Sequence, residues 1–154
     1  MLKAIMVLAI VFAYAENSIA QEIWGRYCNA RFGQCADVPR SYKSDPPPAN
    51  GDGLIFRDGK GMVVVISAMY NASDSSLTDE KNDTLKDLPK PTYQADGGNW
   101  FIISGVRDGK IFYIKKFVTA DHISTLWIEY PGANKELYDA TLSRLSKSFT
   151  PAHN

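Results

Sequence analysis

The sequence predicts an α+β domain in which a mainly antiparallel β-sheet is flanked by helices on both faces, as in an α/β/α sandwich. Residues 62–70 and 99–106 are apolar at both odd and even positions, which indicates strands covered on both faces. Asp-Gly pairs adjoin such runs, as expected for hairpins between antiparallel strands. Two segments, 76–88 and 134–149, carry apolar residues at helical spacing.

The chain opens with a segment that predicts a signal peptide at residues 1–20. Lys3 precedes an apolar run that is too short to span a bilayer but typical of a secretory signal core. Small residues allow cleavage after Ala15 or Ala20, and Ala20 is favoured because a short polar segment then separates the apolar core from the cut. Residues 21–154 would form a single globular domain, and we expect it to be periplasmic or secreted.

Composition excludes several classes of function. The chain has 17 basic and 17 acidic residues and no formal net charge, whereas a nucleic-acid-binding protein needs a basic excess to displace counterions from phosphates. After the signal, no run is long and apolar enough for a transmembrane helix, so we expect no membrane span. Neither a dinucleotide-binding fingerprint nor a Walker loop occurs, and we predict no cofactor.

The two cysteines, Cys28 and Cys35, predict a disulfide that closes a hairpin. An exported protein with two cysteines usually pairs them, and Gly33 supplies the positive φ that a tight reversal needs. Structural zinc requires four ligands, and two thiols without neighbouring partners do not provide them. The spacing is also not Cys-x-x-Cys, so we predict neither a metal site nor redox catalysis.

A loop rich in proline and glycine, residues 46–53, precedes the main strands, because prolines lack N–H donors and glycines favour bends. The tetrapeptide Arg-Asp-Gly-Lys occurs twice, at residues 57–60 and 107–110. Neither copy has the additional oxygen ligands of a calcium loop, so we interpret it as one primed hairpin turn used twice. The predicted strands are 54–57, 62–70, 99–106, 110–119 and 123–130.

The first helix should begin at Ser76, with Asp79 completing a capping box, and should end before Pro89. Its apolar stripe is thin, which predicts a loosely attached surface helix. The second helix has a stronger stripe, formed by Tyr138, Leu142, Leu145 and Phe149. If the first helix were a loop, an all-β barrel with a terminal helix would be the alternative.

A series of short motifs in this order resembles the PsbP-like fold. They are Asp37-Val38-Pro39, the Gly-Asp-Gly loop at residues 51–53, the strand ending at Asn71, Ser76-Leu77, Tyr130-Pro131 and Ser148-Phe149. This family has an antiparallel sheet flanked by helices, and it includes extrinsic photosystem subunits and small exported bacterial domains without an assigned role. The resemblance implies a binding or assembly module rather than a catalyst, and it identifies no ligand-binding residues by number.

Catalytic residues are scarce, and we predict that the protein is not an enzyme. Of the two histidines, His153 lies at the chain end, so a small hydrolase would depend on His122. Ser67 and Ser104 lie in strand patterns, without the sharp turn that presents a nucleophilic serine. A hydrolase using His122 is therefore kept only as an alternative.

The predicted function is that of an exported, non-enzymatic binding or assembly module. Its partner would be another exported protein or a small ligand, and an inhibitor or immunity-type partner of a secreted protein is a narrower alternative. The proposed ligand contacts surround the point where loop 46–53 approaches a strand end, because such loops on a rigid sheet are frequent binding elements. These contacts are Tyr42, Asn50, Asp52 and Trp100.

Overall fold

The computed structural model describes residues 22–153 and contains a seven-stranded, entirely antiparallel sheet. The predicted α+β class is confirmed. The barrel alternative is wrong, because β3 and β6 lie at opposite ends of an open sheet. In spatial order the strands are β3 (Lys43–Ser44), β4 (Gly53–Arg57), β5 (Val63–Tyr70), β9 (His122–Pro131), β8 (Lys110–Val118), β7 (Trp100–Arg107) and β6 (Tyr93–Asp96).

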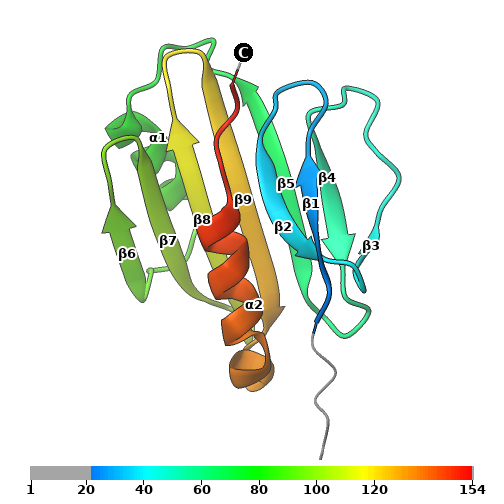
Figure 1. Cartoon of the computed structure of the whole chain (residues 1–154). Helices are drawn as coiled ribbons and strands as arrows, with labels where there is room; N and C mark the ends of the chain where they lie inside the picture. The colour runs from blue at the N-terminus through cyan, green and yellow to red at the C-terminus, as the bar shows by residue number, and fades with distance from the viewer. Residues whose placement is uncertain (1–21, 154) are drawn as a thin grey trace, which may run out of the picture.

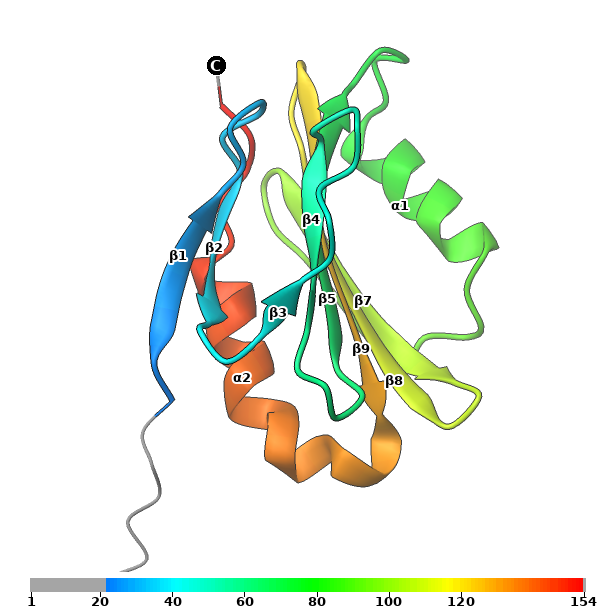
Figure 2. The ribbon, with the colours of Figure 1, turned by 90° about the vertical axis from the view of Figure 1, so that its right-hand side faces the viewer.

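The molecule has three layers (Figures 1 and 2). On one face of the sheet lie helix α2 (Lys135–Ser148), preceded by the short 3₁₀ helix η1 (Gly132–Asn134), and a separate hairpin of β1 (Trp24–Cys28) and β2 (Cys35–Pro39). Helix α1 (Leu77–Lys86) lies on the other face. The hairpin was expected from the sequence, but its place beside α2 as part of a covering layer was not.

Each face of the sheet has its own apolar core, because successive side chains of a strand point to opposite faces. The core under α2 and the hairpin includes the fully buried Val64, Ile66, Leu126, Ile128 and Leu145. The core under α1 includes the fully buried Phe101, Ile103, Phe112 and Ile114.

Both covers are partial, which corrects the expectation that the long strands are buried on both faces. Val63 and Val65 of β5 remain half-buried on the face of α1. On the opposite face, β7 leaves Ile102 half-buried and Val106 51% exposed. The reason is that α1 packs on β7 and β8, whereas α2 packs on β9 and on the hairpin. Each face is therefore only partly covered at a different end of the sheet.

The helices begin and end as their sequences require. Ser76 caps α1, its side chain accepting from the backbone N–H of Asp79, and the Asp79 carboxylate accepts from the backbone N–H of Ser76. No residue of α1 is fully buried, in line with its thin apolar stripe. In α2, Tyr138 and Leu145 are buried, so this helix packs more closely on its face of the sheet than α1 does on the other face.

The two Arg-Asp-Gly-Lys copies form different turns. At Asp108-Gly109 both residues have positive φ, 51° and 75°, so β7 and β8 are joined by the predicted two-residue primed turn. The first copy contradicts the prediction, because β4 and β5 are joined by the five residues 58–62. There the φ of Gly61 is 120°, a value that favours glycine, and the longer loop turns around the Asp58 side chain.

The predicted disulfide is confirmed. Cys28 and Cys35 are bonded and lie directly opposite each other in the β1–β2 register, with their Cα atoms 4.1 Å apart. Gly33, in the turn between them, has the expected positive φ of 75°.

The predicted signal at residues 1–20 lies outside the described residues. No helix within residues 22–153 is long and apolar enough to cross a membrane.

Candidate binding site

A hollow lined mainly by polar residues lies at the end of the molecule where α2 begins. It has a volume of about 250 Å³ and is formed by the connection from β2 to β3, the β4–β5 loop and the first two turns of α2. We call it the Tyr42 pocket. Its lining residues are Glu22, Ser41, Tyr42, Asp58, Lys60, Leu137, Tyr138 and Thr141.

Asp58 holds one wall of the Tyr42 pocket in place. Its Oδ1 atom accepts the backbone N–H groups of Lys60 (2.7 Å), Gly61 (2.9 Å) and Met62 (2.9 Å), which fixes the loop. Its Oδ2 atom accepts the hydroxyl proton of Tyr138 from α2. Partial burial acts to raise the pKa of the Asp58 carboxyl, but these four hydrogen bonds outweigh burial and leave the pKa below its usual value.

The two tyrosines of the Tyr42 pocket are both held in their protonated form. Burial, the hydrogen bond to Asp58 and the charge of Asp58 together raise the pKa of Tyr138 to about 12. The hydroxyl of Tyr42 donates to Met62 Sδ at 3.1 Å. Burial, followed by the nearby Asp58, Tyr138 and Glu22, raises the pKa of Tyr42 well above its ordinary value.

Each tyrosine hydroxyl donates its hydrogen bond within the protein, so that its oxygen can only accept further hydrogen bonds. At the rim, Ser41 Oγ donates to Glu22 Oε1 at 2.9 Å, so this hydroxyl proton is also used within the protein. Lys60 is the one lining residue with a charged donor group. The Tyr42 pocket therefore offers mainly hydrogen-bond acceptors.

The structure does not bring the four sequence-predicted contacts together. Tyr42 lines the pocket, whereas Asn50 and Asp52 lie in the loop before β4, where the Asn50 amide donates to the Asp52 carboxylate at 2.7 Å. Trp100 is on β7, and β5, β9 and β8 separate it from β4. β4 and β7 are therefore four strand spacings apart in the sheet, which corresponds to about 19 Å. At that position the Lys115 ammonium lies 5.7 Å from the centre of the Trp100 ring.

Loop 46–53 is tied to the tip of the β1–β2 hairpin by three side chains that donate to its carbonyl groups. Asn29 Nδ2 bonds to Gly51 O at 2.9 Å, Arg31 to Asn50 O at 2.5 Å, and Gln34 Nε2 to Asp52 O at 3.0 Å. These contacts fix the loop in the fold. The loop leads directly into β4, and its contacts give it a structural role.

His122 is 4% exposed and packs against two aromatic rings that also contact each other. The centroids of Phe32 and Tyr70 are each 5.5 Å from its imidazole. Among residues 22–153 no serine hydroxyl or carboxylate is hydrogen-bonded to this imidazole, and the Ser104 hydroxyl instead donates to Phe112 O at 2.8 Å. Packing therefore accounts for the position of His122.

In the part of the chain that the structure describes, no group of three or more His, Cys, Asp or Glu side chains is arranged to hold a metal ion.

Sequence reasoning missed Asp58 and Tyr138 as members of a site. From the sequence, Asp58 is expected only in a turn, and Tyr138 only in the apolar stripe of the second helix. Gly61 was the available signal, because a second glycine two residues after Asp-Gly distinguishes this copy from Asp108-Gly109.

Comparisons with known proteins support the fold. No family model matches the chain, and no curated protein matches its sequence. Among solved structures, it is similar to the solution structure of cyanobacterial PsbP from Synechocystis sp. PCC 6803, with a TM-score of 0.63 and 12% sequence identity. The match covers 87% of this chain and 95% of that one. The chain therefore has a PsbP-like fold, as its motifs indicated.

Proposed function

We propose that the protein is a non-enzymatic binding module that acts outside the cytosol and holds a cationic group of its ligand in the Tyr42 pocket. The observation that carries this proposal is the orientation of the two tyrosine hydroxyls. Both donate their protons into the protein, to Asp58 and to Met62, so that each oxygen can act toward a ligand only as an acceptor.

Charge and aromatic character favour an ammonium or guanidinium group. Two carboxylates, Glu22 and Asp58, oppose the single ammonium of Lys60. The half-buried ring of Tyr42 can add the electrostatic attraction that aromatic faces exert on cations, whereas the ring of Tyr138 is buried against Tyr130. A volume of about 250 Å³ suits one side chain or a small amine.

The same contacts support binding rather than catalysis. The raised pKa values of Tyr42 and Tyr138 keep both hydroxyls protonated at neutral pH, so neither is a ready base or nucleophile. Asp58 is ionised, but its oxygens already accept four hydrogen bonds.

The proposed location rests on the Cys28–Cys35 disulfide, because such bonds persist in oxidising compartments. An inhibitor or immunity-type role is a narrower form of the proposal. In that form, the cationic group would be a lysine or arginine side chain of the secreted partner.

A titration followed by ¹⁵N–¹H NMR tests the proposal with two probes, Nα-acetyl-lysine methylamide and Nα-acetyl-arginine methylamide. At least one probe should shift the amide signals of residues 41–42, 58–62 and 137–141, and the Glu22→Gln variant should bind it at least fivefold more weakly. Glu136→Gln removes the same charge from an exposed position of α2 outside the pocket and should change the affinity less than twofold.

Two results would overturn this function. One is that neither probe shifts the amide signals of these residues at 20 mM. This concentration is on the order of the dissociation constant of the weakest relevant binding of a single side chain. The other is binding that Glu22→Gln and Glu136→Gln weaken equally, because the Tyr42 pocket would then not be the source of selectivity.

A further inference from the structure

Within the described part of the chain, no strand lies beside the outer edge of β1, and β1 pairs only with β2. The bond from Asn29 N to Gln34 O (3.0 Å), one residue beyond the strand, fixes which residues face β2. The N–H and C=O groups of Trp24, Arg26 and Cys28 consequently point away from β2. Within residues 22–153 these groups have no hydrogen-bond partner.

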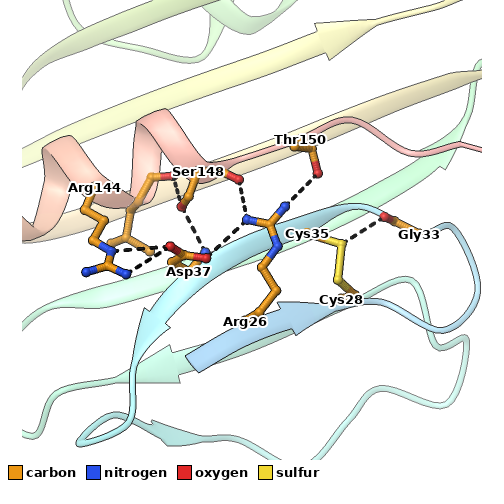
Figure 3. A network of polar contacts seen from close by, with 9 residues as sticks. Arg26, Cys28, Gly33, Cys35, Asp37, Arg144, Ser148 and Thr150 are labelled. Atoms are coloured by element: carbon orange, nitrogen blue, oxygen red, sulfur yellow. Dashed lines mark hydrogen bonds and ion pairs between the residues drawn. A yellow bond between two sulfur atoms is a disulfide. The ribbon is translucent and has the colours of Figure 1, made fainter. Parts of the chain in front are cut away.

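The outer edge of β2, in contrast, is closed by the last residue of α2 and the segment that follows it. Thr150 N donates to Cys35 O at 2.9 Å, and Asp37 N donates to Ser148 Oγ at 2.9 Å. Figure 3 shows the second of these contacts together with the Arg144 guanidinium on the Asp37 carboxylate. The fold therefore uses its own chain to close one edge of the hairpin and leaves the other edge open.

The side chains of β1 do not protect this open edge. Exposed edges usually carry proline, lysine or a bulge, and β1 has none of these. Its only charged side chain, Arg26, is directed toward the end of α2, where NH1 donates to Ser148 O at 2.9 Å and to Asp37 Oδ1 at 3.2 Å (Figure 3). The backbone groups of β1 thus stay accessible to another strand.

An apolar groove runs beside the open edge, between the hairpin and β4. Its volume is about 230 Å³, and Tyr27, Val38 and Phe56 contribute its apolar wall. The rings of Tyr27 and Phe56 meet edge to face at 5.2 Å. Gly25 lines the same groove, and the Arg40 side chain lies over it, with Cγ 3.5 Å from the position that a Cβ atom of Gly25 would take. A strand added to β1 would therefore place every second side chain over an apolar surface.

The charges at this groove are positive. Arg40 lines it, Lys43 lies on the adjoining β3, and both are exposed. Neither forms an ion pair in the described part of the chain. A second copy of this chain added to the same edge would bring like charges together, whereas an acidic segment would neutralise them.

We propose that the open edge of β1 takes an extended acidic segment of a partner protein as a third strand of the hairpin sheet. Backbone hydrogen bonds to Trp24, Arg26 and Cys28 supply the affinity, and alternate apolar side chains of the partner fill the groove. Arg40 and Lys43 select for acidic residues. This surface lies outside the Tyr42 pocket except for Tyr42, which lines both hollows, and the inference does not rest on a ligand in that pocket.

Hydrogen exchange of the whole protein, with and without a nine-residue peptide that alternates valine and glutamate, tests the strand addition. Binding should slow exchange at least tenfold at the amides of Trp24, Arg26 and Cys28. The amides of Gly25 and Tyr27, which already face β2, should change little. Bound peptide without this alternating protection would overturn the proposed mode of binding, and no binding would overturn the site.

Charge substitutions test the selectivity of the site. The double variant Arg40→Glu/Lys43→Glu should bind the acidic peptide at least tenfold more weakly and should gain affinity for the same peptide with lysine in place of glutamate. Lys90→Glu/Lys147→Glu, the same change at exposed positions elsewhere, should bind as the unmodified protein does. Equal losses in the two double variants would mean that only net charge matters and would contradict the site.

Two further measurements separate this inference from its alternatives. Protection of the same three amides without peptide, together with a concentration-dependent dimer in sedimentation experiments, would show that a second copy closes the edge and would overturn the inference. Glu22→Gln should leave the affinity for the acidic peptide within twofold of that of the unmodified protein. Binding in the Tyr42 pocket and binding at the β1 edge can then be disproved separately. A larger loss would contradict the independence of the two sites.

Discussion

Asp58 and Asp108 occupy the same position in the repeated Arg-Asp-Gly-Lys tetrapeptide, but they contribute differently to the fold. Asp58 accepts three backbone N–H groups and the Tyr138 hydroxyl, and so connects the β4–β5 loop to α2. Asp108 lies in a two-residue turn, with a φ of 51°. The same tetrapeptide therefore links a loop to a helix by hydrogen bonds in one place and forms only a hairpin turn in the other.

A matched pair of substitutions measures this difference. Asp58→Asn replaces one acceptor oxygen by an amide and removes the charge from the remaining hydrogen bonds, which should lower the free energy of unfolding by about 1–2 kcal/mol. Asp108→Asn should change it by less than about 0.5 kcal/mol, because asparagine tolerates positive φ. Urea unfolding followed by tryptophan fluorescence provides both values, and equal losses would show that the Asp58 contacts contribute nothing beyond the turn.

The pKa of Asp58 adds a pH dependence. Because the folded-state pKa lies below the ordinary value of 3.8, the carboxylate contributes stability that is fully present above that value and is lost as pH falls through the folded-state pKa. The unfolding free energy of Asp58→Asn should therefore depend less steeply on pH below about pH 5. Parallel acid profiles of the variant and the unmodified protein, measured by urea unfolding from pH 7 to 3, would contradict this assignment.

At the scale of elements, the β1–β2 hairpin depends on a covalent link as well as on packing. Its two strands have five residues each, and only the core-facing half of their side chains contacts the sheet. The disulfide joins positions seven residues apart in sequence, so it closes a short loop of the unfolded chain.

Removal of the disulfide in the Cys28→Ser/Cys35→Ser variant should lower the free energy of unfolding by about 2.5 kcal/mol, the value that the chain-entropy model gives for a loop of this length. Denaturant unfolding under oxidising and reducing conditions measures the change. Dithiothreitol should destabilise the unmodified protein by a similar amount and leave the double variant unaffected. A loss below about 0.5 kcal/mol would mean that hairpin packing alone holds the element, against the chain-entropy model.

At the scale of the whole molecule, the two helices cover unequal parts of the sheet. Leu145 of α2 is fully buried in one core, whereas Leu85 of α1 is only partly buried at the border of the other. The α2 layer also includes the hairpin and the Arg26 and Arg144 contacts to Asp37 (Figure 3). The stability of the domain should therefore depend mostly on this layer.

Leucine-to-alanine substitutions compare the two layers. Leu145→Ala should cost about 3 kcal/mol, because a fully enclosed side chain leaves a cavity, and Leu85→Ala about 1 kcal/mol. Denaturant unfolding measures both. Similar costs would contradict the view that α1 is a loosely attached cover.

The fold was largely predictable, because secondary structure and strand direction depend on local patterns. The apolar runs flanked by turn residues, the capping box at Ser76 and the spacing of the cysteines each set a local geometry that tertiary packing retained. The candidate site was not predictable to the same degree. Of the residues expected at a site, only Tyr42 lines the pocket, since its other walls come from segments distant in the sequence.

The sequence by itself determined the leading hairpin, five strands of the main sheet, both helices, the paired cysteines and the resemblance to the PsbP-like fold, but not the edge strands β3 and β6. Each correct prediction follows from interactions between residues close along the chain or from a fixed order of motifs. Only the tertiary structure decided which part of each face stays only partly covered, how the two copies of one tetrapeptide differ, and which edge of the hairpin is left open. Those features depend on what packs against each segment, and contacts such as Asp58 with Tyr138 join residues 80 positions apart.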